Sequence, residues 1–233
     1  GSLEMHQSID KKQKYIFLII IFLFLTTINN TNFVNNKYFS ANIKSIQVVG
    51  LTEDLNLQIQ ERLSYLKNNN IFYINKELLK KEIDEYKYIE SFKVSKFYPK
   101  KIVLNLYQTN FLAITIKNNQ KYILGSNGKL IEYELFNNYD NLPIIFGNFS
   151  TNDFLNFKKK FDQSSFKYKD IKVFFFYPSK RWDIQTIDNV IVKLPSKNTS
   201  LALERATKII ESKQFDNNII DLRITRQIIL TNE

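Results

Sequence analysis

Residues 88–107 read Tyr88-Ile-Glu-Ser-Phe-Lys-Val-Ser-Lys-Phe-Tyr-Pro-Lys-Lys-Ile-Val-Leu-Asn-Leu-Tyr107. Apolar side chains recur at every second position on both sides of one break: Phe92 and Val94, then Ile102, Leu104 and Leu106. Such alternation is typical of a strand with one buried face. The break is Tyr98-Pro99, and proline favours a turn. The segment therefore predicts two strands joined at an aromatic–proline pair.

Working outward from these strands, the preceding residues predict one more strand and two helices. Ile46 and Val48 alternate with polar neighbours and Gly50 ends the run, which indicates a strand. Two helices follow, the second with Asn75 as its N-cap. Their expected inward residues are Leu55, Ile59, Leu63 and Leu66 in the first, and Leu78, Leu79, Ile83 and Tyr86 in the second. The order β-α-α-β-β over 43–108 predicts an α+β domain with helices on one face of a small sheet.

The following residues, 109–233, are mostly short apolar runs separated by turn residues, which predicts a β-rich second domain. We expect an antiparallel sheet with helices at 153–161 and from Thr199 or Ser200. The expected strands are 113–116, 121–124, 130–133, 172–177, 182–186 and 190–194, with 143–147 as a further apolar run. The last run, 219–230, is predicted to be one long strand at the sheet edge.

The beginning of the sequence predicts a membrane segment. Tyr15-Ile-Phe-Leu-Ile-Ile-Ile-Phe-Leu-Phe-Leu25 is an unbroken apolar run, preceded by Lys11, Lys12 and Lys14. Basic residues stay in the cytoplasm, so the remainder is expected outside it. The run to Ile28 covers roughly 21 Å of a hydrocarbon core of about 30 Å. No small-residue cleavage motif follows, which favours a signal anchor at 15–34 over a removed signal peptide.

This interpretation divides the N-terminal part into three pieces. Residues 1–14 are the expected cytoplasmic tail, in which Gly1-Ser2-Leu3-Glu4 before Met5 is typical of a cloning scar. Residues 35–42 are the expected linker to the first domain. The bulk of the chain is then expected on the outer side of the membrane as a single-pass type II protein.

Composition argues against several classes of function. The chain has no cysteine and a single histidine, His6, so thiolate metal sites and cysteine nucleophiles are excluded. Its formal net charge is +10, but the lysines are spread along the chain, which does not favour nucleic-acid binding. No phosphate-binding glycine loop or catalytic serine, lysine or zinc motif is present. We therefore predict no enzyme, cofactor, metal or small-molecule substrate.

The outer part resembles the bacterial cell-division family FtsQ, called DivIB in Gram-positive bacteria. Residues 46–50 and 88–107 look like the opening strand and the closing hairpin of its POTRA domain. Gln108 stands where the family commonly has an acidic residue. Further motifs that match its β-rich domain in order are Phe111-Leu-Ala113, Gly128 with Leu130-Ile131, Arg181-Trp-Asp-Ile184, Val192-Lys-Leu-Pro195 and Ile220-Asp-Leu-Arg223.

The resemblance implies a non-enzymatic scaffold of the divisome in the inner membrane at the septum. It implies binding of FtsB and FtsL and, through them, control of septal peptidoglycan synthesis by FtsW and FtsI. In the family FtsB adds to the edge strand of the second domain, a form of β-augmentation. The partner site implied here is Arg181, Arg223, Ile224, Thr225, Gln227 and Ile228. Arg181 and Arg223 are expected to pair a partner carboxylate, and Ile224, at an often aromatic position, implies a smaller pocket and lower affinity.

Other functions remain open at this point. A POTRA protein of export or outer-membrane assembly could act as a chaperone or partner-binding module, although such proteins usually carry several POTRA copies or a barrel. A secreted wall-binding or carbohydrate-binding module would need a removed signal peptide and an exposed aromatic platform. Trp182 is more often a core residue than such a platform.

Overall fold

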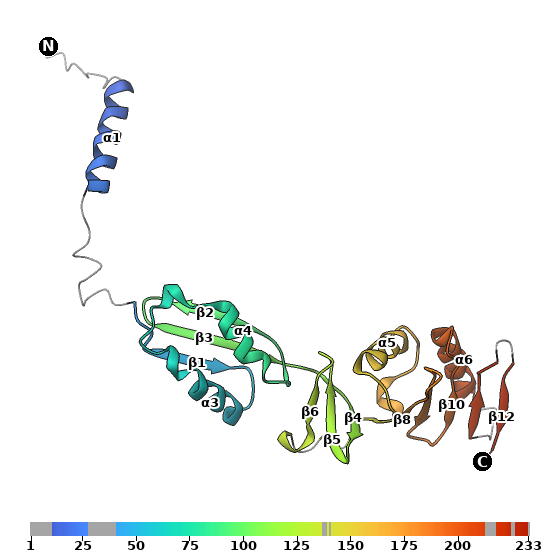
Figure 1. Cartoon of the computed structure of the whole chain (residues 1–233). Coiled ribbons are helices and arrows are strands. Elements are labelled where there is room, and N and C mark those ends of the chain that lie inside the picture. The colour runs from blue at the N-terminus through green and yellow to red at the C-terminus, as the bar shows by residue number, and fades with distance from the viewer. Residues whose placement is uncertain are drawn as a thin grey trace, which may run out of the picture.

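The computed structural model describes residues 11–27, 41–136, 139, 141–212, 218–224 and 227–232. Two domains lie side by side, each built around its own sheet, and a separate helix α1 (Lys11–Thr27) precedes them (Figure 1). The apolar side chains of α1 from Tyr15 to Leu25 are exposed. None of the helices in the described ranges is long and apolar enough to cross a bilayer. Residues 28–34 of the predicted anchor and 35–40 of the predicted linker lie outside those ranges.

The first domain has the predicted order β-α-α-β-β. Its elements are β1 (Ser45–Val49), α3 (Glu53–Arg62), η2 (Leu63–Leu66), η3 (Ile71–Tyr73), α4 (Lys76–Asp84), β2 (Ile89–Phe97) and β3 (Lys101–Gln108). The sheet order is β1-β3-β2, with β3 parallel to β1 and antiparallel to β2. The turn between β2 and β3 is the predicted aromatic–proline pair, and the Tyr98–Pro99 peptide bond is cis.

Local chemistry explains where α4 begins and which face it buries. The Asn75 side chain accepts hydrogen bonds from the backbone N–H groups of Glu77 and Leu78, which confirms the predicted N-cap. Leu79 and Ile83 are buried, as predicted. The prediction for Leu78 was wrong, since its side chain is 46% exposed. Neighbouring helix positions differ by about 100° around the axis, so adjacent leucines cannot both face one sheet.

The second domain contains one sheet of nine strands among the described residues, in the order β12-β11-β10-β9-β8-β7-β4-β5-β6. The strands are β4 (Phe111–Lys117), β5 (Gln120–Gly125), β6 (Leu130–Glu132), β7 (Ile144–Phe146), β8 (Ile171–Phe176), β9 (Trp182–Thr186), β10 (Ile191–Lys193), β11 (Ile219–Asp221) and β12 (Ile229–Thr231). The helical segments are η4 (Tyr133–Leu135), α5 (Thr151–Phe161), η5 (Tyr168–Asp170) and α6 (Thr199–Ser212). Figure 1 shows α5 and α6 on the same face of the sheet.

The prediction of an antiparallel sheet was wrong, because the sheet is mixed. β4 with β7, β7 with β8, and β10 with β11 are parallel pairs. Parallel neighbours need a crossover, which is commonly a helix. Helix α5 joins β7 to β8 and helix α6 joins β10 to β11, so the two helices of this domain serve as crossovers.

The prediction of one strand over 219–230 was also wrong, because the chain forms the antiparallel hairpin β11–β12. The first strand ends where the Asp221 carboxylate accepts the backbone N–H of Arg223, an Asx turn that competes with strand pairing. The polar sequence Thr225-Arg226-Gln227 also interrupts the apolar alternation. The predicted C-terminal edge strand therefore exists, but only as the short strand β12.

A dense aromatic core holds the second domain together. Trp182 is buried, as expected, and stacks on Phe157 with ring centroids 5.0 Å apart. Phe154 and Phe174 contact the same cluster at 5.4 Å from each other. Burying a large apolar side chain contributes roughly 1.5–3 kcal/mol, so the contact of α5 with the sheet is a main source of stability.

The two domains are in contact through both apolar side chains and hydrogen bonds. Ile131 and Phe136 of the second domain belong to the same buried cluster as the core of the first domain. The Asn127 side-chain amide donates to the carbonyl oxygens of Lys87 and Ile89, at 3.0 and 3.2 Å. These contacts place the β6 end of the nine-stranded sheet against the first domain and leave β12 at the far end (Figure 1).

Candidate functional site

The exposed strand β12 forms the edge of the nine-stranded sheet that lies away from the first domain. This strand pairs with β11 on one side and is the last strand in the sheet order. All three of its residues are exposed. A terminal strand presents N–H and C=O groups on its outer side that can pair with another strand. The arrangement can therefore bind an extended segment of another protein.

Apolar side chains surround this strand. Ile224 is 53% exposed and Ile228 is 49% exposed, and Ile229 and Leu230 follow on β12 itself. We call these four residues the apolar edge. A single exposed aliphatic side chain is ordinary, but four together on and beside a strand with one free edge are typical of an interaction site. The apolar edge would add hydrophobic contacts to backbone pairing along β12.

Arg223, at the end of β11, is held by a carboxylate of its own chain. Its Nε lies 2.9 Å from both carboxylate oxygens of Asp221, and its Nη2 donates to Asp221 Oδ2 at 2.5 Å. The Arg223 side chain is still 44% exposed, whereas Asp221 is largely buried. The guanidinium therefore has a fixed direction and an accessible surface.

Arg181, just before β9, is held in the same way by Asp183. Its Nε donates to Asp183 Oδ1 at 3.1 Å and its Nη2 to Oδ2 at 3.3 Å. Asp183 is buried and also accepts the backbone N–H of Leu194 at 3.1 Å. The guanidinium carbon lies 4.4 Å from the centre of the Tyr177 ring, a cation–π distance.

The sheet register brings the two arginines to one end of the site. Lys193 of β10 lies opposite both Asp183 of β9 and Asp221 of β11. Because β9 runs antiparallel to β10 and β11, Arg181 precedes this row and Arg223 follows it in the same direction. They are thus two strands apart, or about 10 Å. Charges alternate in sign across the row, from Asp183 through Lys193 to Asp221, and each aspartate is paired with an arginine beside the row.

The two carboxylates of this row respond to their surroundings in opposite ways. Burial raises the pKa of the Asp183 carboxyl, although the hydrogen bond from Arg181 opposes this effect. Hydrogen bonding from Arg223 lowers the pKa of the Asp221 carboxyl. The difference follows from depth, because desolvation disfavours the charged form of the deeper group. Each arginine is held in place by its hydrogen bonds to one of these carboxylates.

The structure places the predicted site residues as follows. Arg181 precedes β9 and Arg223 follows β11, so both lie at the same edge of the sheet, where these strands begin and end. Ile224, Gln227 and Ile228 lie in the hairpin between β11 and β12. Thr225 lies outside the described residues. Ile229 and Leu230 were missed as site residues, although the run Ile228-Ile-Leu230 on an edge strand must place at least one side chain outward. The internal partners Asp183 and Asp221 were also missed. Asp183 follows Arg181 by two positions, and Asp221 precedes Arg223 by two positions.

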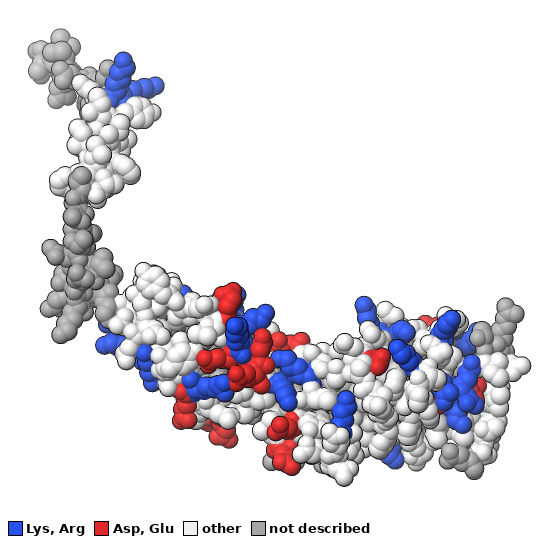
Figure 2. All heavy atoms as spheres, in the orientation of Figure 1, with Lys and Arg blue, Asp and Glu red and all other residues white. Residues whose placement is uncertain are grey.

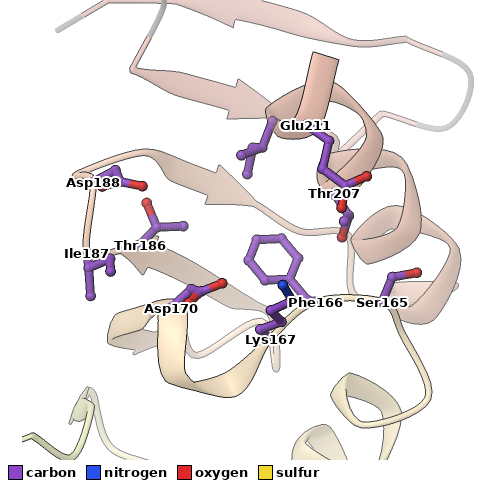
Figure 3. A pocket seen from close by; sticks show the side chains of 10 residues that line it. Ser165, Phe166, Lys167, Asp170, Thr186, Ile187, Asp188, Thr207 and Glu211 are labelled. Atoms are coloured by element: carbon purple, nitrogen blue, oxygen red, sulfur yellow. The ribbon is translucent and has the colours of Figure 1, made fainter. Parts of the chain in front are cut away.

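A separate hollow lies between α6, the β9–β10 turn and the segment before β8 (Figure 3). Two of the hydroxyl groups that line it have partners within the chain. The Thr207 hydroxyl donates to the Leu203 carbonyl oxygen at 3.0 Å, and Thr186 Oγ1 accepts the Val190 N–H at 3.1 Å. Across the described ranges, no group of three or more side chains could hold a metal ion. The hollow thus carries no assignment, and the edge of the sheet is the candidate site.

Comparison with known families agrees with this division of the chain. The family described as "POTRA domain, FtsQ-type" matches residues 41–107, and "Cell division protein FtsQ/DivIB, C-terminal" matches residues 113–223. The chain belongs to the FtsQ/DivIB family. The first match covers the first domain and the second covers the nine-stranded sheet through β11, so the whole of β12 lies beyond the matched residues.

Individual members of the FtsQ/DivIB family are only distantly similar. The cell division protein DivIB of Clostridium botulinum (strain Hall) is 30% identical over 132 residues, which cover 56% of this chain and 51% of that protein. FtsQ of Rhizobium meliloti is 22% identical over 185 residues, which cover 78% and 60%. The chain thus spans about half the length of the DivIB relatives that it matches.

A solved FtsQ/DivIB structure was also found, the major extracytoplasmic domain of the trans isomer of DivIB from Geobacillus stearothermophilus. It is 11% identical, with a TM-score of 0.34, and the match covers 46% of this chain and 94% of that one.

Proposed function

We propose that this chain is a non-enzymatic scaffold of the divisome that recruits FtsB and FtsL through the β12 edge. The observation that carries the proposal is the exposed terminal strand β12 with the apolar edge around it. A partner strand that pairs with β12 would gain backbone hydrogen bonds, while the apolar edge would select the register. Membership of the FtsQ/DivIB family supports a role in cell division for such a surface.

We also propose a role for the two arginines. Each guanidinium is already paired within the chain, so a partner carboxylate at Arg223 would share it with Asp221. A guanidinium carries five N–H donors and can bind two carboxylates at once. We therefore propose that Asp221 fixes the direction of Arg223 and that the exposed part of Arg223 meets the partner. Arg181, which is more buried, would play the same role deeper in the site.

The remaining part of the proposal concerns location. The apolar helix α1 and the lysines before Tyr15 support a membrane anchor with both domains on its outer side. The proposed scaffold would thereby act at the septum and, through FtsB and FtsL, influence peptidoglycan synthesis by FtsW and FtsI.

The test is calorimetric binding of the full chain, held in lipid nanodiscs, to the periplasmic FtsB–FtsL segments of the same organism. We expect saturable binding that the substitution Leu230→Lys weakens at least about tenfold, or about 1.4 kcal/mol. The matched control is Ile187→Lys, because Ile187 is also an exposed isoleucine of the second domain, at 55%, but lies in the β9–β10 turn. Equal losses in both variants would contradict a site at β12.

Hydrogen exchange separates strand addition from side-chain docking. If a partner strand pairs with β12, the backbone amides among Ile229 to Thr231 that face away from β11 become protected when the partner is added. Protection of first-domain amides instead would show that the partner binds the first domain and not β12. It would support the alternative of a POTRA module that binds export or outer-membrane partners.

A further inference from the structure

Four aromatic side chains are exposed together at one end of the first domain. Phe72 and Tyr73 lie in η3, and Phe97 and Tyr98 lie at the end of β2 and in the following turn. Their exposed fractions are 59%, 84%, 55% and 59%. We call these four residues the aromatic tip. Aromatic side chains are mostly buried in soluble domains. Four neighbouring ones that are each more than half exposed therefore indicate a surface that binds a membrane or another molecule.

The aromatic tip is held in place by its own contacts. The rings of Phe72 and Tyr98 stack with centroids 5.0 Å apart, which joins η3 to the β2–β3 turn. Asn70 accepts the Phe72 N–H at 2.9 Å and so fixes the start of η3. The exposed rings are thus presented by a defined backbone on two connected segments.

Lysines accompany the aromatic tip. Lys96 Nζ lies 3.5 Å from the Phe72 carbonyl oxygen, and Lys101 Nζ lies 6.0 Å from the centre of the Phe97 ring. Lys44 is tied to the same turn, because its N–H donates to the Lys100 carbonyl oxygen at 2.8 Å. Figure 2 shows the acidic side chains of the first domain over its middle, away from the end at which the chain enters, and others on the second domain.

The aromatic tip lies where the described chain enters the first domain from α1. The N–H of Ile71, the first residue of η3, donates to the Ala41 carbonyl oxygen at 2.9 Å, and Asn42 bridges to Asn70. Residues 28–40 separate α1 from this point, with a reach of at most about 45 Å. The tether thus allows contact between the aromatic tip and a membrane that holds α1, without enforcing it.

We propose that the aromatic tip and its lysines dock the first domain on an anionic lipid surface; this rests on the proposed membrane anchor. Rings of Tyr and Phe favour the headgroup region, where a polar edge stays wet and an apolar body is covered. Lysines beside them are attracted to anionic headgroups. A protein partner would not by itself account for the position of this surface beside the chain's entry from an apolar helix.

The test uses tryptophan quenching in proteoliposomes that contain anionic phospholipids with brominated acyl chains. Tyr73→Trp places a reporter in the aromatic tip, and the native Trp182 is buried in the second domain and supplies the baseline. The control is Tyr107→Trp, because Tyr107 is also an exposed tyrosine of this domain but lies at the opposite end of β3. Over six strand residues the two ends of β3 are about 20 Å apart.

We expect at least about twofold quenching of the reporter at position 73 and none at position 107 beyond the baseline. Lys44→Glu with Lys101→Glu should remove the quenching at position 73, and so should replacing the anionic lipids by zwitterionic ones. Equal quenching at both positions, or quenching at neither, overturns the proposal. A protein partner at the aromatic tip would give the second of these results.

Flotation of the vesicles after an alkaline wash tests separately whether α1 anchors the chain in the membrane. A chain that floats with the vesicles but shows no quenching at position 73 has an anchor and no docking surface. A chain that is washed off, yet is quenched when bound before the wash, has a docking surface and no anchor. The failure of one proposal is therefore distinguishable from the failure of the other.

Discussion

Arg223 and Asp221, two residues apart, form a closed pair in which Arg223 Nε lies 2.9 Å from both carboxylate oxygens. The same carboxylate accepts the backbone N–H of Arg223 and ends β11. One pair of side chains thus stops a strand and aims a cation beside the β12 edge. Stability and partner binding should therefore depend on the two residues in different ways.

The first prediction concerns binding. Arg223→Glu should weaken the binding of FtsB–FtsL by about 2 kcal/mol or more, because a partner carboxylate would meet a like charge. The measurement is the same nanodisc calorimetry. Arg205→Glu is the matched control, since Arg205 is an exposed arginine of the same domain on helix α6. Unchanged affinity in the Arg223 variant would remove this residue from the partner site.

The second prediction concerns acid stability. Because Arg223 lowers the pKa of Asp221, this carboxylate contributes stability above its usual pKa of about 3.9. The contribution is lost as the pH falls through the lowered folded value. Asp221→Asn should lower the free energy of unfolding at pH 7 by about 1–2 kcal/mol and flatten its decline below pH 3.9.

Denaturant unfolding at several pH values checks this result. Asp183 has a raised pKa, so its contribution falls as the pH rises above about 3.9, and the two carboxylates act in separate windows. An Asp221→Asn chain with the wild-type slope below pH 3.9 would show that this pair does not control acid stability.

The third prediction concerns Tyr88, at the contact between the domains. Burial raises the pKa of Tyr88 to about 12, and its buried hydroxyl has no hydrogen-bond partner among the described residues. Tyr88→Phe should therefore raise the free energy of unfolding by up to about 1 kcal/mol. It should also remove stability loss between about pH 10 and 12, where the unfolded phenol ionises first.

Chemical denaturation of Tyr65→Phe provides the comparison. The Tyr65 hydroxyl donates to Glu82 Oε1 at 2.8 Å, so its removal should be neutral or slightly destabilising. A destabilised Tyr88→Phe chain would mean that the hydroxyl at position 88 has a partner in the folded protein.

The fourth prediction concerns Asn127, whose amide joins the domains. Besides its two donated hydrogen bonds, its Oδ1 accepts the Lys129 N–H at 3.0 Å. Asn127→Ala should lower the free energy of unfolding by about 1–3 kcal/mol, because two hydrogen bonds between the domains are lost, each worth about 0.5–1.5 kcal/mol. Small-angle scattering should also show a broader range of distances between the domains.

Asn152→Ala is the control for this measurement, because Asn152 is an exposed asparagine of α5 away from the contact. If the two variants have the same stability and scattering curves, the Asn127 amide does not hold the domains together.

The first domain could be predicted closely because its periodicities are local. The alternation around Tyr98-Pro99 and the cap at Asn75 correspond to elements that the structure contains. The second domain was less predictable, since β7 and β10 have three residues each and their parallel neighbours come from distant parts of the chain. A period-two pattern indicates a strand, but it does not say which strand lies beside it.

The candidate site was also predicted only in part. The arginines and the apolar character of the last segment follow from the sequence and the family resemblance. Their internal pairing does not, because an i,i+2 carboxylate could equally face solvent. Only the register of β9, β10 and β11 shows that Asp183, Lys193 and Asp221 lie in one row.

The two ends of the nine-stranded sheet are unequal: β6 packs against the first domain, and β12 ends the sheet at the other side. Growth by strand pairing can therefore start at one end only. Head-to-tail growth of this sheet into a fibre would need a receptive strand at both ends, and β6 is packed against the first domain. Two copies that met through β12 would close on each other and stop. The nine-stranded sheet is therefore a terminus in an array that is paired through β12, and a different protein would have to extend such an array.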